Sequence, residues 1–208
     1  MQPQVIRSPA GERIAGREYS VKELASLLNQ QASILHENEG GITFSGGEPL
    51  SQAEFVAEVI DKLDDLHVVL DTSGHAPQED FLRLLHRVDL FFYDLKLMDG
   101  GLHQRYTGLD NDLILRNLQL LDESGKPFVI RVPLVPGVTD TNENLAGIAA
   151  AIKDMPGLLE VDLLPYNRAA GSKYEYVGMQ FRPDYDDRRP LNINLDIFKQ
   201  VGLKAKCT

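Results

Sequence analysis

Short apolar runs alternate with amphipathic helical patterns along most of this chain, and this alternation constrains its fold more than any other feature of the sequence. The predicted strands are the apolar runs at residues 42–45, 68–70, 90–93, 128–132 and 159–164. Strands with nearly continuous apolar runs that are each followed by a helix are typical of a parallel sheet covered by helices. Because about five or six such units are too few to close an eight-stranded barrel, we expect an α/β fold, an open partial (β/α) barrel with parallel strands.

The helices are predicted from their apolar spacing and from the residues at their ends. A Ser or Asp followed three residues later by Glu predicts the first turn of a helix. This pattern occurs at Ser20 and Glu23, at Ser51 and Glu54, and at Asp140 and Glu143. Pro77 is expected to begin another helix, and Gly125 to end the helix predicted over 112–121. A helix over 191–201 and a short strand near Lys204 complete the expected order of elements.

Length and charge limit the classes of protein to which the chain can belong. A chain of 208 residues fits one domain, 1–208, since single cores grow to roughly 250 residues before chains divide. The formal net charge of −10 argues against a nucleic-acid partner, because nucleic-acid binders usually present a basic face. No run of about 18 apolar residues predicts a membrane span, and residues 1–10 lack the apolar core of a secretory signal. We therefore expect a cytoplasmic protein.

Two further features bear on the chemistry of the chain. The stretch 165–190 has no clear period, and a loop of that length inside a compact domain is usually functional. The chain contains one cysteine, Cys207. One thiol excludes an internal disulfide, and it is too few for an iron–sulfur cluster, which is usually held by several thiolates.

The predicted strands end in unusually polar segments. In parallel α/β architectures, ligands bind at the carboxyl ends of the strands. The polar residues found there are Ser45-Gly46-Gly47-Glu48-Pro49, Asp71-Thr72-Ser73-Gly74, Asp94, Lys96, Arg131 and Pro165-Tyr166-Asn167. The sequence therefore predicts one site built from five strand ends.

The pair Gly46-Gly47 lies between a predicted strand and a predicted helix. Glycine permits positive φ and close approach of the backbone to a ligand. Backbone donors at such a turn suit a carboxylate or a phosphate, while Glu48 can accept a hydrogen bond from an amine. A tight turn with a solvated Glu48 is the alternative interpretation.

Charged residues follow the next three strands. Asp71 and Asp94 can share a cation or orient a cationic ligand, or each can cap the turn that follows it. Lys96 lies two residues beyond Asp94 and therefore on the same face if the strand continues. It can bind an anion, form a Schiff base or remain a solvated rim residue. Arg131 interrupts an apolar strand, so we expect it to contact a carboxylate or a ligand, or to form a structural ion pair.

Taken in order, these motifs resemble those of the glycyl radical enzyme activating enzymes, the pyruvate formate-lyase activating enzyme family of the radical S-adenosylmethionine (SAM) superfamily. The motifs that carry the resemblance are Ser45-Gly-Gly-Glu-Pro49, Asp71-Thr-Ser-Gly74, Tyr93-Asp-Leu-Lys96, Arg131 with Val135-Pro-Gly137, and Leu163-Leu-Pro-Tyr-Asn167. The resemblance extends over nearly all of residues 16–178.

The resemblance implies the cofactor S-adenosyl-L-methionine and a set of residues that bind it. The implied cofactor-binding residues are Gly46, Gly47, Glu48, Pro49, Asp71, Ser73, Arg131 and Asn167. Of these, the Gly-Gly-Glu-Pro motif holds the methionyl amino group in the family, and Asn167 stands where many members have His near the adenosyl group. A monovalent cation is implied at Asp71, Thr72 and Asp94, and Lys96 matches a lysine near the peptide of the partner.

The resemblance also implies an activity and a partner. In the family, a 4Fe–4S cluster held by a CxxxCxxC motif on the first strand cleaves the cofactor to a 5′-deoxyadenosyl radical. That radical takes hydrogen from a glycine loop of a partner glycyl radical enzyme. This chain has no such motif. The resemblance therefore indicates the C-terminal portion of such an oxidoreductase, a partial barrel without its first strand. On this interpretation, 1–15 is a remnant of the N-terminal part, and a cluster-bearing segment is a further partner.

Two functions of other classes remain open. A non-catalytic module would use the same strand ends to bind a nucleoside cofactor or a partner protein. An unrelated barrel lyase would use Lys96 as a Schiff-base nucleophile.

Overall fold

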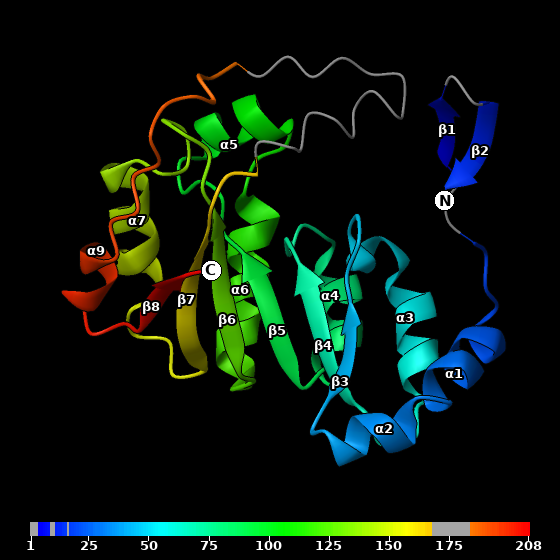
Figure 1. Ribbon diagram of the computed structural model, residues 1–208. Coiled ribbons are helices and arrows are strands. Elements are labelled where there is room, and N and C mark those ends of the chain that lie inside the picture. The colour runs from blue at the N-terminus through cyan, green and yellow to red at the C-terminus, as the bar shows by residue number, and fades with distance from the viewer. Residues whose placement is uncertain (1–3, 9–10, 16, 168–183) are drawn as a thin grey trace.

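The computed structural model describes residues 4–8, 11–15, 17–167 and 184–208, and its centre is one open parallel sheet (Figure 1). The strands are β3 (Gly41–Phe44), β4 (His67–Thr72), β5 (Leu90–Asp94), β6 (Phe128–Pro133), β7 (Leu158–Leu164) and β8 (Ala205–Cys207). They lie in the sheet in the order in which they occur in the sequence, and every neighbouring pair is parallel. The predicted α/β class, an open all-parallel sheet typical of a partial barrel, is confirmed.

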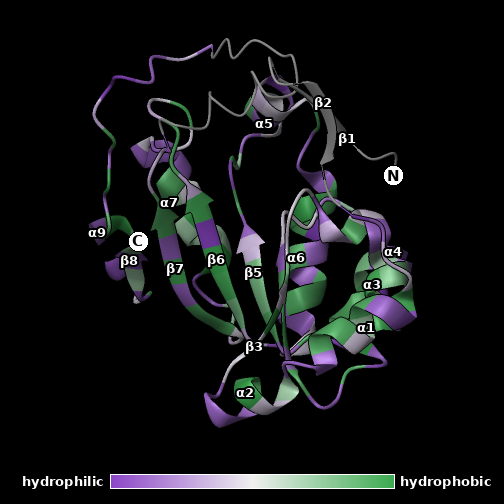
Figure 2. Cartoon of the chain, turned by 45° about the vertical axis from the view of Figure 1, so that its right-hand side comes forward, coloured by the Kyte–Doolittle hydropathy of each residue, from purple (hydrophilic) through white to green (hydrophobic). Residues whose placement is uncertain are grey.

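The helices of the described residues are α1 (Val21–Asn29), α2 (Ala32–Glu37), α3 (Ala53–Ile60), α4 (Gln78–Leu85), α5 (Gly100–Thr107), α6 (Asp112–Ser124), α7 (Asn142–Ile152) and α9 (Asp196–Lys199), with the 3-10 turn η1 (Pro49–Gln52) before α3. The turned view of Figure 2 shows α6 and α7 behind the strands, α5 above the sheet and α2 below it. In the part of the chain that the structure describes, no helix covers the opposite face of the sheet. Among the same residues, no helix has both the length and the apolar character that crossing a bilayer requires.

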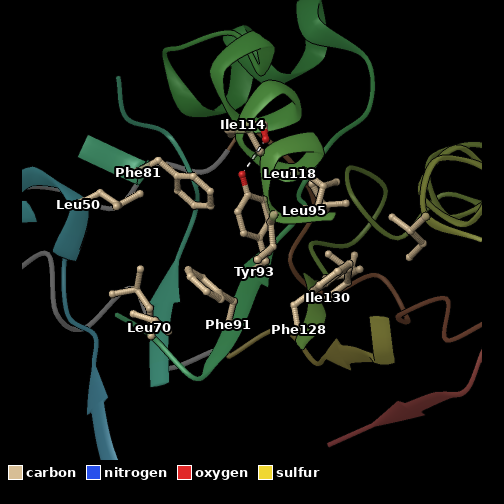
Figure 3. Packing of buried hydrophobic residues seen from close by; sticks show 14 of the residues in the cluster. Leu50, Leu70, Phe81, Phe91, Tyr93, Leu95, Ile114, Leu118, Phe128 and Ile130 are labelled. Carbon is tan, nitrogen blue, oxygen red and sulfur yellow. Dashed lines mark hydrogen bonds between the residues drawn. The ribbon is translucent and has the colours of Figure 1, made fainter. Parts of the chain in front are cut away.

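The core forms between the sheet and its helices because successive strand side chains point to opposite faces. On β5, Phe91 and Tyr93 are buried against Phe81 of α4, whose ring lies 5.9 Å from that of Phe91. Figure 3 shows these rings packed beneath α6. The alternate residues, Asp71 on β4 and Asp94 on β5, point to the uncovered face. Parallel strands bring their carboxyl ends to one edge, so the polar ends of the strands meet there.

Several predicted helix ends are confirmed. Ser20 and Glu23 form the expected reciprocal capping pair at the start of α1. Pro77 directly precedes α4, and α6 ends at Gly125, which adopts a left-handed conformation with φ of 69°.

Two predicted capping pairs are wrong because nonlocal or backbone partners take the side chains. The Ser51 hydroxyl donates to the Glu48 carbonyl at 2.7 Å, and the chain passes through η1 before α3 begins at Ala53. Thr141, not Asp140, caps α7, since its side chain accepts from the backbone N–H of Asn144.

Other elements differ from the prediction in extent. The sequence patterns did not predict α5, and the final helix is limited to α9. Strands β1 (Gln4–Ser8) and β2 (Gly11–Ala15) form a separate antiparallel hairpin within the segment expected to be a remnant. Residues 168–183 of the long loop lie outside the described residues, and the flanking 165–167 and 184–190 form neither helix nor strand.

Candidate functional site

The polar ends of four strands surround one cavity of about 140 Å³ at the carboxyl edge of the sheet. The residues that line it are Ser45, Gly46, Gly47, Glu48, Asp71, Thr72, Ser73, Asp94, Lys96 and Arg131. Three carboxylates and two cationic side chains therefore face the same small space. The predicted convergence of the ends of β3, β4, β5 and β6 is found.

Arg131 connects the ends of three strands. Its Nε and Nη2 atoms donate to one oxygen of Asp94 at 3.1 and 3.0 Å, and Asp94 is its register partner on β5. Its Nη1 and Nη2 atoms donate to the two oxygens of Asp71 on β4 at 3.1 and 2.5 Å. The guanidinium also lies 5.6 Å from the centre of the Phe92 ring. The cation that Asp71 and Asp94 share in this structure is thus the side chain of Arg131, which contacts carboxylates as predicted.

The glycine loop after β3 leaves its backbone accessible from the cavity. Gly46 has φ of 119°, a conformation that residues with a Cβ rarely adopt. A Cβ added at Gly46 or Gly47 would meet no atom within 4 Å, so there is open space beside both residues. Ser45 anchors the start of the loop, because its hydroxyl donates to Asp71 at 2.9 Å. Such a loop can bring backbone polar groups against a small ligand.

The Glu48 carboxylate is bound to the end of β4. Its Oε1 atom accepts from the Thr72 hydroxyl at 2.5 Å and from the Leu50 N–H at 3.1 Å. Its Oε2 atom accepts from the hydroxyl and the backbone N–H of Ser73, at 2.6 and 2.9 Å. A carboxylate has about four lone-pair positions, and four donors of the protein occupy them. Glu48 therefore fixes the glycine loop onto β4 and contributes its negative charge to the cavity.

Lys96 is the more accessible of the two cations in the cavity. Its Nζ atom lies 3.4 Å from Asp94, and its side chain keeps 33% of its exposure, against 21% for Arg131. The backbone around it is held from α7, because the buried Asn144 side chain donates to the Lys96 carbonyl at 2.9 Å and accepts from the Met98 N–H. The ammonium group is thus placed at the mouth of the cavity on a fixed backbone.

Tyr93 lies directly under the site on the core side of β5. Burial, and to a lesser degree the negative charge of Glu48, raise the pKa of its phenol well above the ordinary value. The hydroxyl donates to the Ile114 carbonyl at 2.6 Å, the contact drawn in Figure 3. Tyr93 is therefore a protonated, buried support of the site and not one of its lining groups.

Two predicted site residues do not line the cavity. Pro49 is buried at the start of η1, and Asn167 is exposed beyond the end of β7. Tyr166, also predicted at this edge, packs against Tyr185 with the ring centres 5.9 Å apart. The end of β7 therefore does not contribute to this cavity.

Asp162 on β7 is a neighbour of the site that the sequence patterns missed. It is the register partner of Arg131 on one side and of Lys206 on the other. Its carboxylate accepts from the Thr208 hydroxyl at 2.8 and 2.9 Å instead of contacting Arg131. The signal that would have revealed it is the one that revealed Arg131, a charged residue inside an otherwise apolar strand.

The lining residues fit the amino-acid end of a ligand such as SAM better than they fit a metal cluster. Accessible loop backbone and charges of both signs match an ammonium and a carboxylate group. Cys207 lies on β8, at the opposite edge of the sheet from β3, and burial and then Asp162 raise the pKa of its thiol. A 4Fe–4S cluster usually needs several thiolates, so the residues of this chain do not fit one. Across the described ranges, no group of three or more His, Cys, Asp and Glu side chains is placed to hold a metal ion.

The fold and the strand-end cavity define a class of protein, and comparison with known families agrees with it. Residues 7–147 match the family model of the radical SAM superfamily, and the chain belongs to this superfamily. Relatives within it have more particular functions. The chain is 36% identical over 197 residues to the trans-4-hydroxy-L-proline dehydratase activating enzyme of Clostridioides difficile, covering 90% of this chain and 63% of that protein.

Two further comparisons indicate the same group. The 4-hydroxyphenylacetate decarboxylase activating enzyme of Clostridioides difficile (strain 630) is 35% identical over 181 residues, covering 85% of this chain and 56% of that protein. A domain of a pyruvate-formate lyase-activating enzyme from Bacteroides vulgatus ATCC 8482 has a similar structure, with a TM-score of 0.65 and 30% identity, covering 81% of this chain and 99% of that one. The chain thus spans 56–63% of the length of these two curated relatives.

Proposed function

We propose that this chain binds the methionyl end of SAM at its strand-end cavity and forms the cofactor-binding portion of a glycyl radical enzyme activating enzyme. The observation that carries the proposal is the meeting of three carboxylates and two cations beneath an accessible glycine loop. Membership in the radical SAM superfamily and the names of the relatives support the choice of ligand and of partner.

Charge complementarity supports this ligand. SAM carries an ammonium, a sulfonium and a carboxylate, so its formal charge is positive. The cavity has one more carboxylate than cations. In the proposed complex, the segment Gly46 to Pro49 holds the ammonium through its backbone and the nearby charge of Glu48. In the same complex, Arg131 and Ser73 lie next to the carboxylate of the SAM methionyl group.

The size of the cavity indicates which part of the ligand it takes. Sites for small molecules usually enclose about 300–1,000 Å³, and this cavity of about 140 Å³ is smaller. It suits an amino-acid group alone. We propose that the adenosyl group lies across the uncovered face of the sheet toward Asn167.

The remaining assignments rest on the family. A monovalent cation beside the cofactor carboxylate would use Asp71, Thr72 and Asp94, and Lys96 would face the glycine loop of the partner glycyl radical enzyme. The iron–sulfur cluster supplies the electron that begins the radical reaction in this superfamily. We propose that its thiolate ligands belong to a cysteine-bearing segment that the present sequence does not contain, and that both act in the cytoplasm.

Calorimetry with SAM tests the proposal on the chain as it exists. Without cluster iron as a second anchor, binding is expected at roughly high micromolar to millimolar concentration, about 4–6 kcal/mol. Glu48→Gln is expected to weaken it about tenfold, or about 1.4 kcal/mol, because it removes a negative charge near the ammonium and replaces an oxygen that accepts from β4 by an amide N–H₂ group.

The matched control is Glu160→Gln. Glu160 is also a half-buried carboxylate on the sheet, and it is ion-paired with Lys206 at 2.6 Å, away from the cavity. This variant should bind as the unmodified chain does. Absence of binding by the unmodified chain, or an equal effect of both substitutions, would refute the proposed site.

The single cysteine favours one alternative, a non-catalytic module that binds the same cofactor or a partner protein. The DNA next to the coding sequence distinguishes the two. A continuous frame that encodes CxxxCxxC supports the activating enzyme, and its absence supports the module.

A further inference from the structure

A buried asparagine holds the turn that follows β4. Asn117 lies on the core face of α6 with none of its surface exposed. Its amide nitrogen donates to the carbonyls of Gly74 and Ala76 at 2.8 and 2.9 Å. Its amide oxygen accepts no hydrogen bond from the described part of the chain. Because a buried acceptor without a partner destabilises the folded state, packing alone would favour an apolar residue here. The function of this amide is therefore to bind the two carbonyls of the turn.

The turn in its present shape directs two hydroxyl groups at Glu48. The Thr72 hydroxyl accepts from the Gly74 N–H at 2.9 Å and donates to Glu48. The Ser73 hydroxyl accepts from the His75 N–H at 3.4 Å and also donates to Glu48. Each hydroxyl has one proton, which it donates to the carboxylate, and it accepts at the same time from a backbone N–H of the turn, which fixes the position of its oxygen. The geometry of residues 72–76 thus determines how Glu48 is held.

The core supports the same turn from below. A Cβ at Gly74 would lie 1.8 Å from the Tyr93 hydroxyl, so the backbone rests directly on that group. The hydroxyl is fixed in turn by its bond to the Ile114 carbonyl of α6 (Figure 3). Helix α6 therefore positions the turn twice, through Asn117 and through Tyr93.

We propose that Asn117 is a positioning residue for the ligand site, acting through residues 72–76 on Glu48 and thereby on the glycine loop. The expected effect of Asn117 on SAM affinity rests on the proposed function. Its expected effect on the Glu48 hydrogen bonds of the free protein does not.

Amide hydrogen exchange tests the inference without ligand. The backbone N–H groups of Ser73 and Leu50 both donate to Glu48, and they report on the two sides of this connection. Asn117→Ala is expected to accelerate their native-state exchange at least tenfold. If that variant does not fold, Asn117→Ser, which keeps a small polar side chain, takes its place with the same expectation.

The matched control is Asn111→Ala, at the N-cap of α6. Asn111 is 4% exposed and donates to the carbonyls of Leu97 and Met98, both at 3.0 Å. Its substitution therefore removes the same kind of contacts, but after β5 instead of after β4. Its substitution should leave Ser73 and Leu50 unchanged. Unchanged exchange in the Asn117 variants, or equal acceleration by Asn111→Ala, would overturn the inference.

A double-mutant cycle with SAM tests the route through Glu48. Asn117→Ser should weaken binding about tenfold in the unmodified chain and by less than twofold in the Glu48→Gln background. Equal losses in both backgrounds would show that Asn117 does not act through Glu48, which overturns the inference. If the unmodified chain does not bind SAM, the proposed function fails, while the exchange experiment still decides the role of Asn117.

Discussion

Replacing Arg131 with methionine is expected to destabilise the fold by about 2–3 kcal/mol. Arg131 makes four N–H···O contacts with Asp71 and Asp94, and the substitution leaves both carboxylates without it. Removing one partner of a fully buried ion pair costs about 3–5 kcal/mol. The three side chains keep 16–21% of their exposure, so water compensates part of that loss.

Substitution of Arg87, which forms a similar but more exposed ion pair, shows how much of the cost at Arg131 comes from burial. It also forms a two-pronged contact with a carboxylate, donating to both oxygens of Asp61 at 2.8 and 3.0 Å. Its side chain is 37% exposed and that of Asp61 is 53% exposed. Exposed ion pairs contribute about 0–1 kcal/mol, so Arg87→Met should cost no more than about 1 kcal/mol.

Urea unfolding at neutral pH, followed by circular dichroism, measures both costs. In a background that carries Asp71→Asn and Asp94→Asn, Arg131→Met should cost less than about 1 kcal/mol, because neutral amides need no counter-charge. Equal costs for Arg131→Met and Arg87→Met would refute the reasoning. They would mean that the strand-end charges behave as a solvated surface pair.

Three further predictions concern other parts of the molecule. Gly74→Ala should lower the free energy of unfolding, measured in urea, by at least about 2 kcal/mol, because Gly74 has positive φ and its new Cβ would collide with Tyr93. Gly108 also has positive φ, 88°, but open space lies around it, so Gly108→Ala should cost only about 1–2 kcal/mol. Because the folded-state pKa of Tyr93 is raised, the contribution of its phenol to stability is complete below about pH 10 and is lost as the pH rises further. The Tyr93→Phe variant should therefore lose less unfolding free energy than the unmodified chain between neutral and alkaline pH. Equal losses in the two proteins would contradict this. Since burial and then Asp162 raise the pKa of Cys207, iodoacetamide at pH 8 should label it more slowly than in urea, and equal rates would contradict this.

The sheet was predictable because its strands are apolar and its helices are amphipathic, and both signals are local. Helix α5 was missed because it begins with Gly100 and Gly101 and has a weak apolar face. The capping pattern at Ser51 failed because the Glu48 carbonyl takes the hydroxyl, a contact that spacing alone does not reveal. Local patterns thus predicted the elements, but not every residue at which they begin.

The position of the site was predictable from topology, since parallel strands place their carboxyl ends together. Its internal pairing was not. The sequence left open which cation lies between Asp71 and Asp94, and the register of β5 with β6 determines that it is Arg131. Asn117 was invisible for another reason. Its spacing on α6 matches the apolar face, and its partners, the carbonyls of the β4 turn, carry no sequence signal.

A crystal structure of this chain with SAM tests the central claim most directly. The account predicts that the methionyl group lies in the cavity between the Gly46 loop and Arg131, with the adenosyl group over the uncovered face of the sheet. A ligand bound instead in the larger cavity of about 440 Å³ beside α5 and α7, lined by Met98 and Tyr106 among others, would contradict it.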